Sequence, residues 1–336
     1  MGVNSEVSDL RDTEKKALDE LKQLIQTALI NHEFTSPSPH PKPIKEEEVF
    51  FWGIPLIGDE KSDAILLKFL RTRDFKAKEA FTMIKNTVKW RKEFGIDTLL
   101  DEDLGLSNDL ENVFFMDGFD KKGHPVCYTV YGEFQSNKDL YSKMFSSEEK
   151  RLKFVEWRIQ FLEKSIRKQL DFGGVSTFLQ IHDLKNSPGA GKWELRLAAD
   201  QAFDLIQDHY PEFAAKHVLI NVPWWYLAFY KMVSPFLPQR TKSKFVFTGP
   251  SKSPKTLFKV VSWEGEVSYC AEFVPDNEPG YTVTMQKKRI ISSSDEQVIC
   301  NSFKVGEPGK IVLTFENYSY KKKIVLYRAK AKRCSD

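Results

Sequence analysis

The apolar positions near the start of the chain follow the 3.6-residue period of an amphipathic helix. Between residues 9 and 30, Leu, Ile and Ala form one stripe, whereas charged residues occupy the other positions. Proline then alternates in "TSPSPHPKP", which predicts a stiff, extended linker. We therefore expect residues 1–35 to form a helical arm, tethered outside the main body by a linker of residues 36–45. Such an arm is either solvated or binds a partner.

A compact helical lobe is predicted next, over residues 46–105. The segment "SDAILLKFLRTRDF" places apolar residues on one helical face, and Ser62 and Asp63 are candidates for its N-terminal cap. The segment "KAKEAFTMIKNTVKWRKEFG" repeats this pattern, and Gly95 is expected to end its helix.

The period then changes to an alternation of strands and helices. The predicted strands are "HPVCYTVYGEF", "STFLQIHDL", "HVLINVP" and "KFVFTG". The predicted helices between them are "RLKFVEWRIQFLEKSIRKQL", "WELRLAADQAFDLIQDHYPEF" and an aromatic stretch that begins at residue 224. This order predicts an α/β domain over residues 106–262, with a mixed, largely parallel sheet.

The last part of the chain, residues 263–336, has a different pattern of apolar and polar residues. Short alternating runs, among them "YTVTMQKKRII", "QVICNSFKV", "GKIVLTFEN" and "KKKIVLYRAKA", are separated by polar turns. They predict an antiparallel, all-β sandwich. Because an independent sandwich usually takes about 100 residues, we expect this one to be incomplete.

Composition limits the class of protein. The hydrophobic fraction is 41% and the net charge is +3, which is too small to indicate nucleic-acid binding by itself. The sequence contains no run of about 18 apolar residues and no apolar signal region at its start. The four cysteines are far apart in the sequence. We therefore expect a cytoplasmic protein with free thiols.

Motifs of catalysis are weak. "PGAGKW" resembles a phosphate-binding loop, but Asn186 and Trp193 stand where that motif needs Gly and Ser or Thr. The six histidines lack the spacing of metal ligands, so we expect no metal site. His182 and Asp183 form either an acid–base pair or a loop anchor. We expect no enzymatic activity, and a hydrolase or isomerase acting on an apolar substrate is a weaker alternative.

Charge and aromatic residues are distributed unevenly. Five of the seven residues in 224–230 are aromatic, and residues 213–263 hold eight Lys or Arg but no Asp or Glu. Such a stretch faces an anionic membrane, a nucleic acid or nothing in particular. The aromatic helix precedes the basic cluster rather than interleaving with it, which favours a membrane.

The same stretch resembles the sequences of a known family. "LIQDHYPEFAAKHVLINVPWWYLAFYKMVSPFLPQRTKSKFVF" resembles the core of CRAL-TRIO lipid-binding domains, and "FWGIPLIGDEKSDAILLKFLRTRDFKAKEAFTMIKNTVKWRKEFGID" resembles their helical N-terminal portion. "SFKVGEPGKIVLTFENYSYKKKIVLYR" is similar to later strands of a GOLD domain. The combination resembles the patellins of plants from about residue 10 onward.

The resemblance implies an α/β pocket that binds one phospholipid, a phosphoinositide, beneath a mobile gate helix. It further implies a monomeric, peripheral membrane protein that acts in trafficking, cell-plate formation and cytokinesis, with no other cofactor. A trafficking adaptor that works through its GOLD-like domain and N-terminal helix, with a vestigial pocket, is the alternative. Anionic membranes, phosphoinositides and trafficking proteins are thus the expected partners.

The family's functional residues can be matched to this sequence one by one. The lipid headgroup is expected to contact Arg73, Glu212, Thr241 and Lys244. The gate or pocket wall is expected to include Trp224, Trp225, Phe229 and Phe236. The membrane-facing basic residues are expected to be Arg240 and Lys242. For the four headgroup positions the alternatives are a surface salt bridge, a helix-end contact, a cap and an exposed strand-end charge, in that order.

This sequence departs from the family pattern in three places. Phe178 and Gln180 stand where many exchangers of choline lipids have small hydroxyl residues, so we do not expect a choline lipid. Pro238 replaces an acidic residue common in the gate. After "TLFK" the sequence passes directly to "VVSWEGEVSYC", so a segment that joins the two domains is absent.

Overall fold

The computed structural model describes most of the chain. The described residues are 10–34, 48–188, 192–224, 226–227, 239–262, 267–277, 281–291 and 301–317. The helices are α1 (Asp12–Ile30), α2 (Glu60–Thr72), α3 (Ala77–Phe94), α4 (Ile96–Asp101), α5 (Ser107–Leu110), α6 (Glu133–Ser136), α7 (Lys138–Phe145), α8 (Glu148–Gln169), α9 (Trp193–His209), α11 (Gln239–Lys244) and α12 (Ser253–Val260). The strands are β1 (Phe50–Phe51), β2 (Ile54–Pro55), β3 (Phe114–Asp120), β4 (Pro125–Val130), β5 (Phe178–Asp183), β6 (Ala214–Ile220), β7 (Phe245–Phe247), β8 (Val261–Ser262), β9 (Val267–Pro275), β10 (Val283–Ile291) and β11 (Gly309–Asn317).

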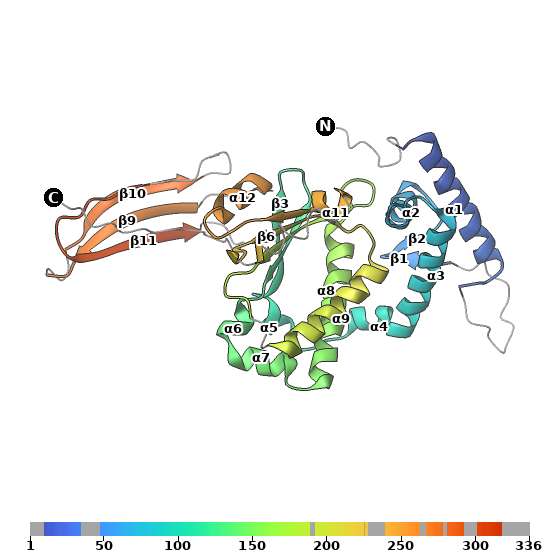
Figure 1. Cartoon of the computed structure of the whole chain (residues 1–336), viewed down its shortest axis with the longest axis horizontal. Coiled ribbons are helices and arrows are strands. Elements are labelled where there is room, and N and C mark those ends of the chain that lie inside the picture. Colours follow the sequence, from blue (N-terminus) through green and yellow to red (C-terminus); the bar gives the residue numbers. More distant parts are fainter. Residues whose placement is uncertain are drawn as a thin grey trace.

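Helix α1 is part of the helical lobe, and the expectation of an arm outside the main body was wrong. Helix α1 lies against α2 and α3 (Figure 1). Its apolar stripe is covered there, and Leu21 and Ile25 are fully buried. On α2, Asp63 accepts a hydrogen bond from Lys22 at 2.8 Å. Burial of two large aliphatic side chains contributes about 3–6 kcal/mol, which outweighs the freedom that the helix gains by detaching.

Single residues set the start of α2 and the end of α3. Helix α2 is capped by Asp59, whose carboxylate accepts from the backbone N–H groups of Lys61 and Ser62, rather than by Ser62 or Asp63 as predicted. Gly95 ends α3 in the left-handed conformation, with φ of 71°, as predicted. The short carboxylate of Asp59 reaches the N–H groups that have no partner within the helix.

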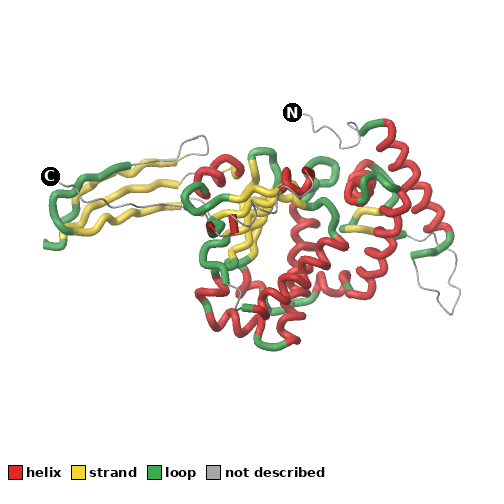
Figure 2. Tube along the Cα trace, in the orientation of Figure 1, coloured by secondary structure: helices red, strands yellow, loops and turns green. Residues whose placement is uncertain are grey.

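The central domain contains a six-stranded sheet in the order β7-β6-β5-β4-β3-β8. Strands β4, β5, β6 and β7 are parallel to one another, whereas β3 is antiparallel to β4 and to β8. Helices α8 and α9 lie side by side next to the sheet (Figure 2). The expected α/β class with a mixed, largely parallel sheet is thus confirmed.

The two faces of this sheet differ in burial. The face that we call the outer face packs against α12, and Val126, Leu179, Ile181 and Val218 on it are at most 1% exposed. The inner face packs against α8 and α9 through Phe114 and Phe178 at its margin. Other side chains of the inner face remain only half-buried; they are Cys127, Gln180, His182, His217, Leu219, Phe245 and Phe247.

The described residues after 266 form a separate three-stranded antiparallel sheet in the order β10-β9-β11, as expected for an all-β module. This sheet projects away from the helical lobe (Figure 1). Residues 301–305 do not form the strand predicted for "QVICNSFKV", and "KKKIVLYRAKA" lies outside the described residues. The consecutive residues Ile311, Val312 and Leu313 are 36–44% exposed, so neither face of β11 is covered as in a closed sandwich.

Candidate functional site: the inner face of the sheet and its rim

Two of the predicted headgroup residues meet at the β6–β7 side of the sheet. The Nζ atom of Lys244 lies 2.6 Å from a carboxylate oxygen of Glu212, and both side chains remain partly exposed. Glu212 lies two residues before the start of β6, and Lys244 lies immediately before β7. Because β6 and β7 are parallel neighbours, the starts of both strands lie at the same edge of the sheet.

The backbone of Glu212 is held by a buried lysine that the sequence analysis did not single out. Lys68, on α2, donates from Nζ to the carbonyl oxygens of Ser176 and Glu212, at 2.7 and 3.1 Å, and to the Ser176 hydroxyl at 3.2 Å. Glu212 has a φ of 55°, which is unfavourable for a non-glycine residue. The Lys68 ammonium also lies 4.5 Å from the centre of the Phe213 ring. Lys68 therefore fixes the turn that presents the Glu212 carboxylate.

Arg73, the third predicted headgroup residue, is exposed just beyond the end of α2. It lines a cleft of about 440 Å³ between α3 and the end of α9, together with Glu79, Asp208 and His209. Asp208 lies four residues before Glu212, so the cleft is near the turn that Lys68 holds. The structure thus brings Glu212 and Lys244 into contact and places Arg73 in a neighbouring cleft.

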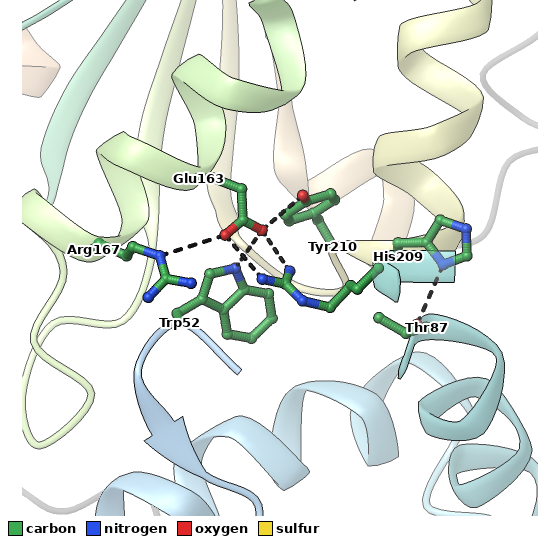
Figure 3. A network of polar contacts seen from close by, with 7 residues as sticks. Trp52, Thr87, Glu163, Arg167, His209 and Tyr210 are labelled. Carbon is green, nitrogen blue, oxygen red and sulfur yellow. Dashed lines mark hydrogen bonds and ion pairs between the residues drawn. The ribbon is translucent and has the colours of Figure 1, made fainter. Parts of the chain in front are cut away.

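A buried carboxylate behind this turn connects the helical lobe to the central domain. Glu163, on α8, is completely buried; it accepts from both terminal nitrogens of Arg91 at 2.5 and 3.1 Å and from Tyr210 Oη at 2.7 Å (Figure 3). Trp52 Nε1 donates to it at 3.0 Å, and Arg167 Nε lies 3.6 Å away. Burial disfavours a charged Arg91, yet the Glu163 carboxylate raises its pKa above the usual value. Burial and the adjacent carboxylate likewise raise the pKa of Tyr210.

The sequence held a signal for both buried charges. Lys68 follows Ala64 by four residues and Ile65 by three, which places it on the apolar face of α2. Glu163 follows Ile159 by four residues and precedes Ile166 by three, which places it on the apolar face of α8. A charge on an apolar helical face needs a partner, but the hydrogen-bond partners of Lys68 and Glu163 lie more than 40 residues away in the sequence.

The start of the predicted gate is anchored at the opposite end of strands β5 and β6. Asn221, with a φ of 54°, donates from Nδ2 to the carboxylate of Asp183 at 2.7 Å, and its backbone N–H donates to the Ser253 hydroxyl at 2.8 Å. The Asp183 carboxylate also accepts from the Lys185 backbone at 2.8 Å. Asp183 is therefore a loop anchor. His182, the other member of the predicted acid–base pair, does not contact it and is on the inner face.

Two aromatic residues at the start of the gate are described, and they lie in different environments. The Trp224 side chain is 80% exposed, whereas the Tyr226 ring lies 6.0 Å from that of Phe247 on the inner face. Lys242 is half-buried on α11. The remaining gate and basic predictions, Trp225, Phe229, Phe236 and the side chains of Arg240 and Thr241, lie outside the described residues.

The half-buried inner face carries aromatic rings and neutral imidazoles. The His182 and His217 rings are stacked, with Nε2 and Nδ1 3.3 Å apart, and His217 stacks on Phe245 at 4.8 Å. Burial lowers the pKa of His182 to about 3 and that of His217 to about 4, helped by the nearby charges of His217 and Arg158 in the first case and of Lys244 in the second. Both histidines are therefore uncharged at neutral pH.

Among the described residues, no group of three or more His, Cys, Asp or Glu side chains is arranged to hold a metal ion. None of the described helices has the length and apolar character needed to cross a membrane. What the described site offers is a face of aromatic rings and neutral imidazoles with an ion pair at its rim.

Comparison with known families agrees with this architecture. The chain matches the CRAL/TRIO domain over residues 110–264, the CRAL/TRIO N-terminal domain over residues 17–86, and the Patellin-1-like C-terminal GOLD domain over residues 240–323. The second match includes α1 from residue 17 onward, in accord with its packing. The fold and these matches define a CRAL/TRIO domain protein that also carries GOLD-domain sequence.

Known proteins specify the family further. The chain is 50% identical to Patellin-3 of Arabidopsis thaliana, with 98% of the chain and 77% of the relative covered. It is 48% identical to Patellin-5 of the same plant, with 98% and 55% covered. The chain belongs to the patellin family. The alignment with Patellin-3 has 388 positions, more than the 336 residues of the chain, so the relative carries sequence that this chain lacks.

More distant similarities extend to fungal proteins. The chain is 30% identical to the phosphatidylinositol transfer protein SFH5 of Meyerozyma guilliermondii, with 70% of each protein covered. A structure described as "Crystal structure of Sfh5" has a TM-score of 0.52 and 22% identity, and covers 71% of this chain and 81% of that one. The latter shows a shared fold. Together the relatives support assignment to the CRAL/TRIO lipid-binding and lipid-transfer proteins.

Proposed function

We propose that the chain is a phosphoinositide-binding, lipid-transfer protein that holds one phospholipid over the inner face of the sheet, beneath a gate that starts at Trp224. The bound lipid is its ligand, and no other cofactor or metal takes part. It acts peripherally on anionic membranes, in trafficking, cell-plate formation and cytokinesis, without covalent chemistry. Its similarity to a phosphatidylinositol transfer protein supports this choice of lipid class.

The observation that carries the proposal is the Glu212–Lys244 ion pair beside the half-buried aromatic face. An ammonium can bind a phosphate, and a carboxylate can accept hydrogen bonds from inositol hydroxyl groups. Without a headgroup the two side chains neutralise each other, and a headgroup inserted between them replaces their mutual contact. Acyl chains would then lie along the half-buried rings, because Phe245 and Phe247 follow Lys244 on the inner face of β7.

The surroundings of the gate support contact with a membrane. An exposed indole such as Trp224 is stabilised at a membrane interface, where its ring is apolar and its N–H group is polar. Basic side chains each contribute about 1 kcal/mol near an anionic bilayer. Arg240 and Lys242 on α11 follow the gate and are the proposed membrane-facing cations.

The test is a flotation and lipid-extraction assay with the double variant Lys244→Ala, Arg73→Ala. Liposomes of phosphatidylcholine with and without phosphatidylinositol 4-phosphate are compared at physiological salt. We expect about tenfold less extraction of the phosphoinositide, since a hydrogen bond to a charged group contributes about 1.5–3 kcal/mol. Lys255→Ala on α12, which removes an exposed cation on the other side of the sheet, is the control.

Unchanged binding and extraction by the double variant would show that the headgroup assignment is wrong. Failure of the unmodified protein to extract any lipid would show that the pocket itself is not functional.

One observation favours the second candidate, an adaptor that recruits trafficking proteins through the GOLD-like domain. Ile311, Val312 and Leu313 leave apolar surface exposed on β11, and exposed apolar surface is typical of protein-binding sites. An adaptor with a vestigial pocket would float with its partners but extract no lipid. The same assay therefore separates the two candidates.

A further inference from the structure

A second cation, distinct from the predicted headgroup residues, lies by the inner face near β3, whereas Lys244 lies at β7. Arg158 is on α8, and the centre of its guanidinium group lies 3.9 Å from the ring centre of Phe114 on β3. Phe114 pairs with Thr129 on β4 and belongs to the inner face. The Nη1 atom of Arg158 is buried and makes no hydrogen bond to any of the described residues. The group is thus held against an aromatic ring with unused donor capacity.

Among the described residues, no carboxylate offsets the charge of Arg158. The two groups that favour its charged form are the Tyr131 hydroxyl and the Cys127 thiol. Burial raises the pKa of both, that of Cys127 to about 11, so neither carries a charge at neutral pH. Burial also lowers the pKa of Arg158 itself, because it removes water from the charged guanidinium.

Arg158 is half-buried, and a cation that has lost part of its hydration without gaining a counter-charge is costly. An unpaired charge in a protein interior is typically destabilising by several kcal/mol, and an unsatisfied buried donor costs about 1–3 kcal/mol. The contact with Phe114 returns only about 2 kcal/mol when desolvated. An anion supplied by a ligand would remove the remainder of this cost, and Arg binds oxyanions well because its donors form a planar fork.

The location separates Arg158 from the rim. Phe114 is on β3 and Lys244 precedes β7, so four strand spacings of about 4.8 Å each, roughly 19 Å, lie between them. Arg158 therefore belongs to a different part of the inner face than the rim residue Lys244.

We propose that Arg158 forms a second anion-binding subsite over the inner face, which binds a singly charged oxyanion of a lipid, either a fatty-acid carboxylate or a phospholipid phosphodiester. The half-buried Phe161 ring, whose centre lies 5.9 Å from the guanidinium, would contact the apolar part of that ligand, whereas Phe114 is already packed in the core. The subsite rests on the proposed function only in requiring that a lipid enters the space over the inner face.

The test compares acidic and neutral lipids of matched chain length on the full chain. Binding of oleate is measured against oleyl alcohol, and binding of phosphatidylinositol against diacylglycerol, by native mass spectrometry of the delipidated protein. Arg158→Met is expected to weaken binding of one acidic lipid by about tenfold or more and to leave its neutral counterpart unchanged. Loss in the oleate arm identifies a carboxylate, and loss in the phosphatidylinositol arm identifies a phosphodiester.

A stability measurement accompanies the binding assay. Because Arg158 lacks a counter-charge, the ligand-free Arg158→Met variant is expected to unfold at the same temperature as the unmodified protein or higher. Arg158→Lys keeps the charge and is expected to keep the preference for the acidic lipid. Arg196→Met, which removes an exposed cation on α9, is the control for net charge and is expected to change neither result.

The outcomes are distinguishable. If the unmodified protein binds these lipids but Arg158→Met keeps the full preference for both acidic lipids, the subsite is refuted while the proposed function stands. The subsite is also refuted if Arg158→Met fails to fold and Arg158→Lys has lost the preference. If the unmodified protein binds none of the four lipids, both proposals fail together.

Discussion

The outer and inner faces of the six-stranded sheet come from the same strands but differ in what they contact. On β5, Leu179 and Ile181 point to the outer face and are 1% exposed, whereas Gln180 and His182 point to the inner face and are half-buried. The outer face is packed against α12 like any protein core. The inner face combines imidazoles, an amide, aromatic rings and a cation. Strand alternation thus separates a face that stabilises the fold from a face that is available to a ligand.

The largest difference between the two faces is expected in stability. Ile181→Ala leaves a cavity in the outer face and should lower the free energy of unfolding by about 2–5 kcal/mol. Gln180→Ala on the inner face should change it by less than about 1 kcal/mol, because that side chain is already half-exposed. Urea denaturation followed by tryptophan fluorescence measures both. Equal losses for the two variants would show that the inner face is packed as tightly as the outer one.

The free energy of unfolding should depend on pH through two histidines of the inner face. The pKa values of His182 and His217, about 3 and about 4 in the folded protein, lie below the usual value of about 6.5 for an unfolded histidine. Between these values the unfolded chain binds protons that the folded protein does not. The stabilising effect of neutral histidines is therefore present above pH 6.5 and is lost as the pH falls toward 4.

The expected slope is about 1.4 kcal/mol per pH unit for each of the two histidines below pH 6. Replacing both with phenylalanine, which preserves stacking on Phe245, should remove this part of the pH dependence. Denaturation series at pH 7, 6 and 5 provide the measurement. If the double variant loses stability on acidification as steeply as the unmodified protein does, the histidines are not the responsible groups.

The sequence predicted the elements of both faces well and their environment poorly. The alternation in "FLQIHD" was visible, but nothing in that strand states which side α8 and α9 cover. Lys68 and Glu163 were missed because their partners come from residues distant in the sequence. The docking of α1 was missed because the proline-rich linker indicated separation, although the apolar stripe that packs on α2 and α3 was already evident.

The smallest effect is expected at β11, an edge strand of the three-stranded sheet whose apolar side chains Ile311, Val312 and Leu313 are exposed. Leu313→Lys on β11 replaces an exposed side chain and should change stability by no more than about 0.5 kcal/mol. If the adaptor candidate is correct, the substitution should nevertheless abolish capture of a partner that the unmodified chain binds. A large loss of stability would instead show that β11 is covered in solution.

The most direct test of the central claim is native mass spectrometry of the full chain purified without added lipid. The account predicts a protein species whose mass exceeds that of the bare chain by one phospholipid. This species should be reduced in the Lys244→Ala, Arg73→Ala variant and retained in Lys255→Ala. A spectrum that contains only the bare chain, before and after incubation with phosphoinositide liposomes, would contradict it.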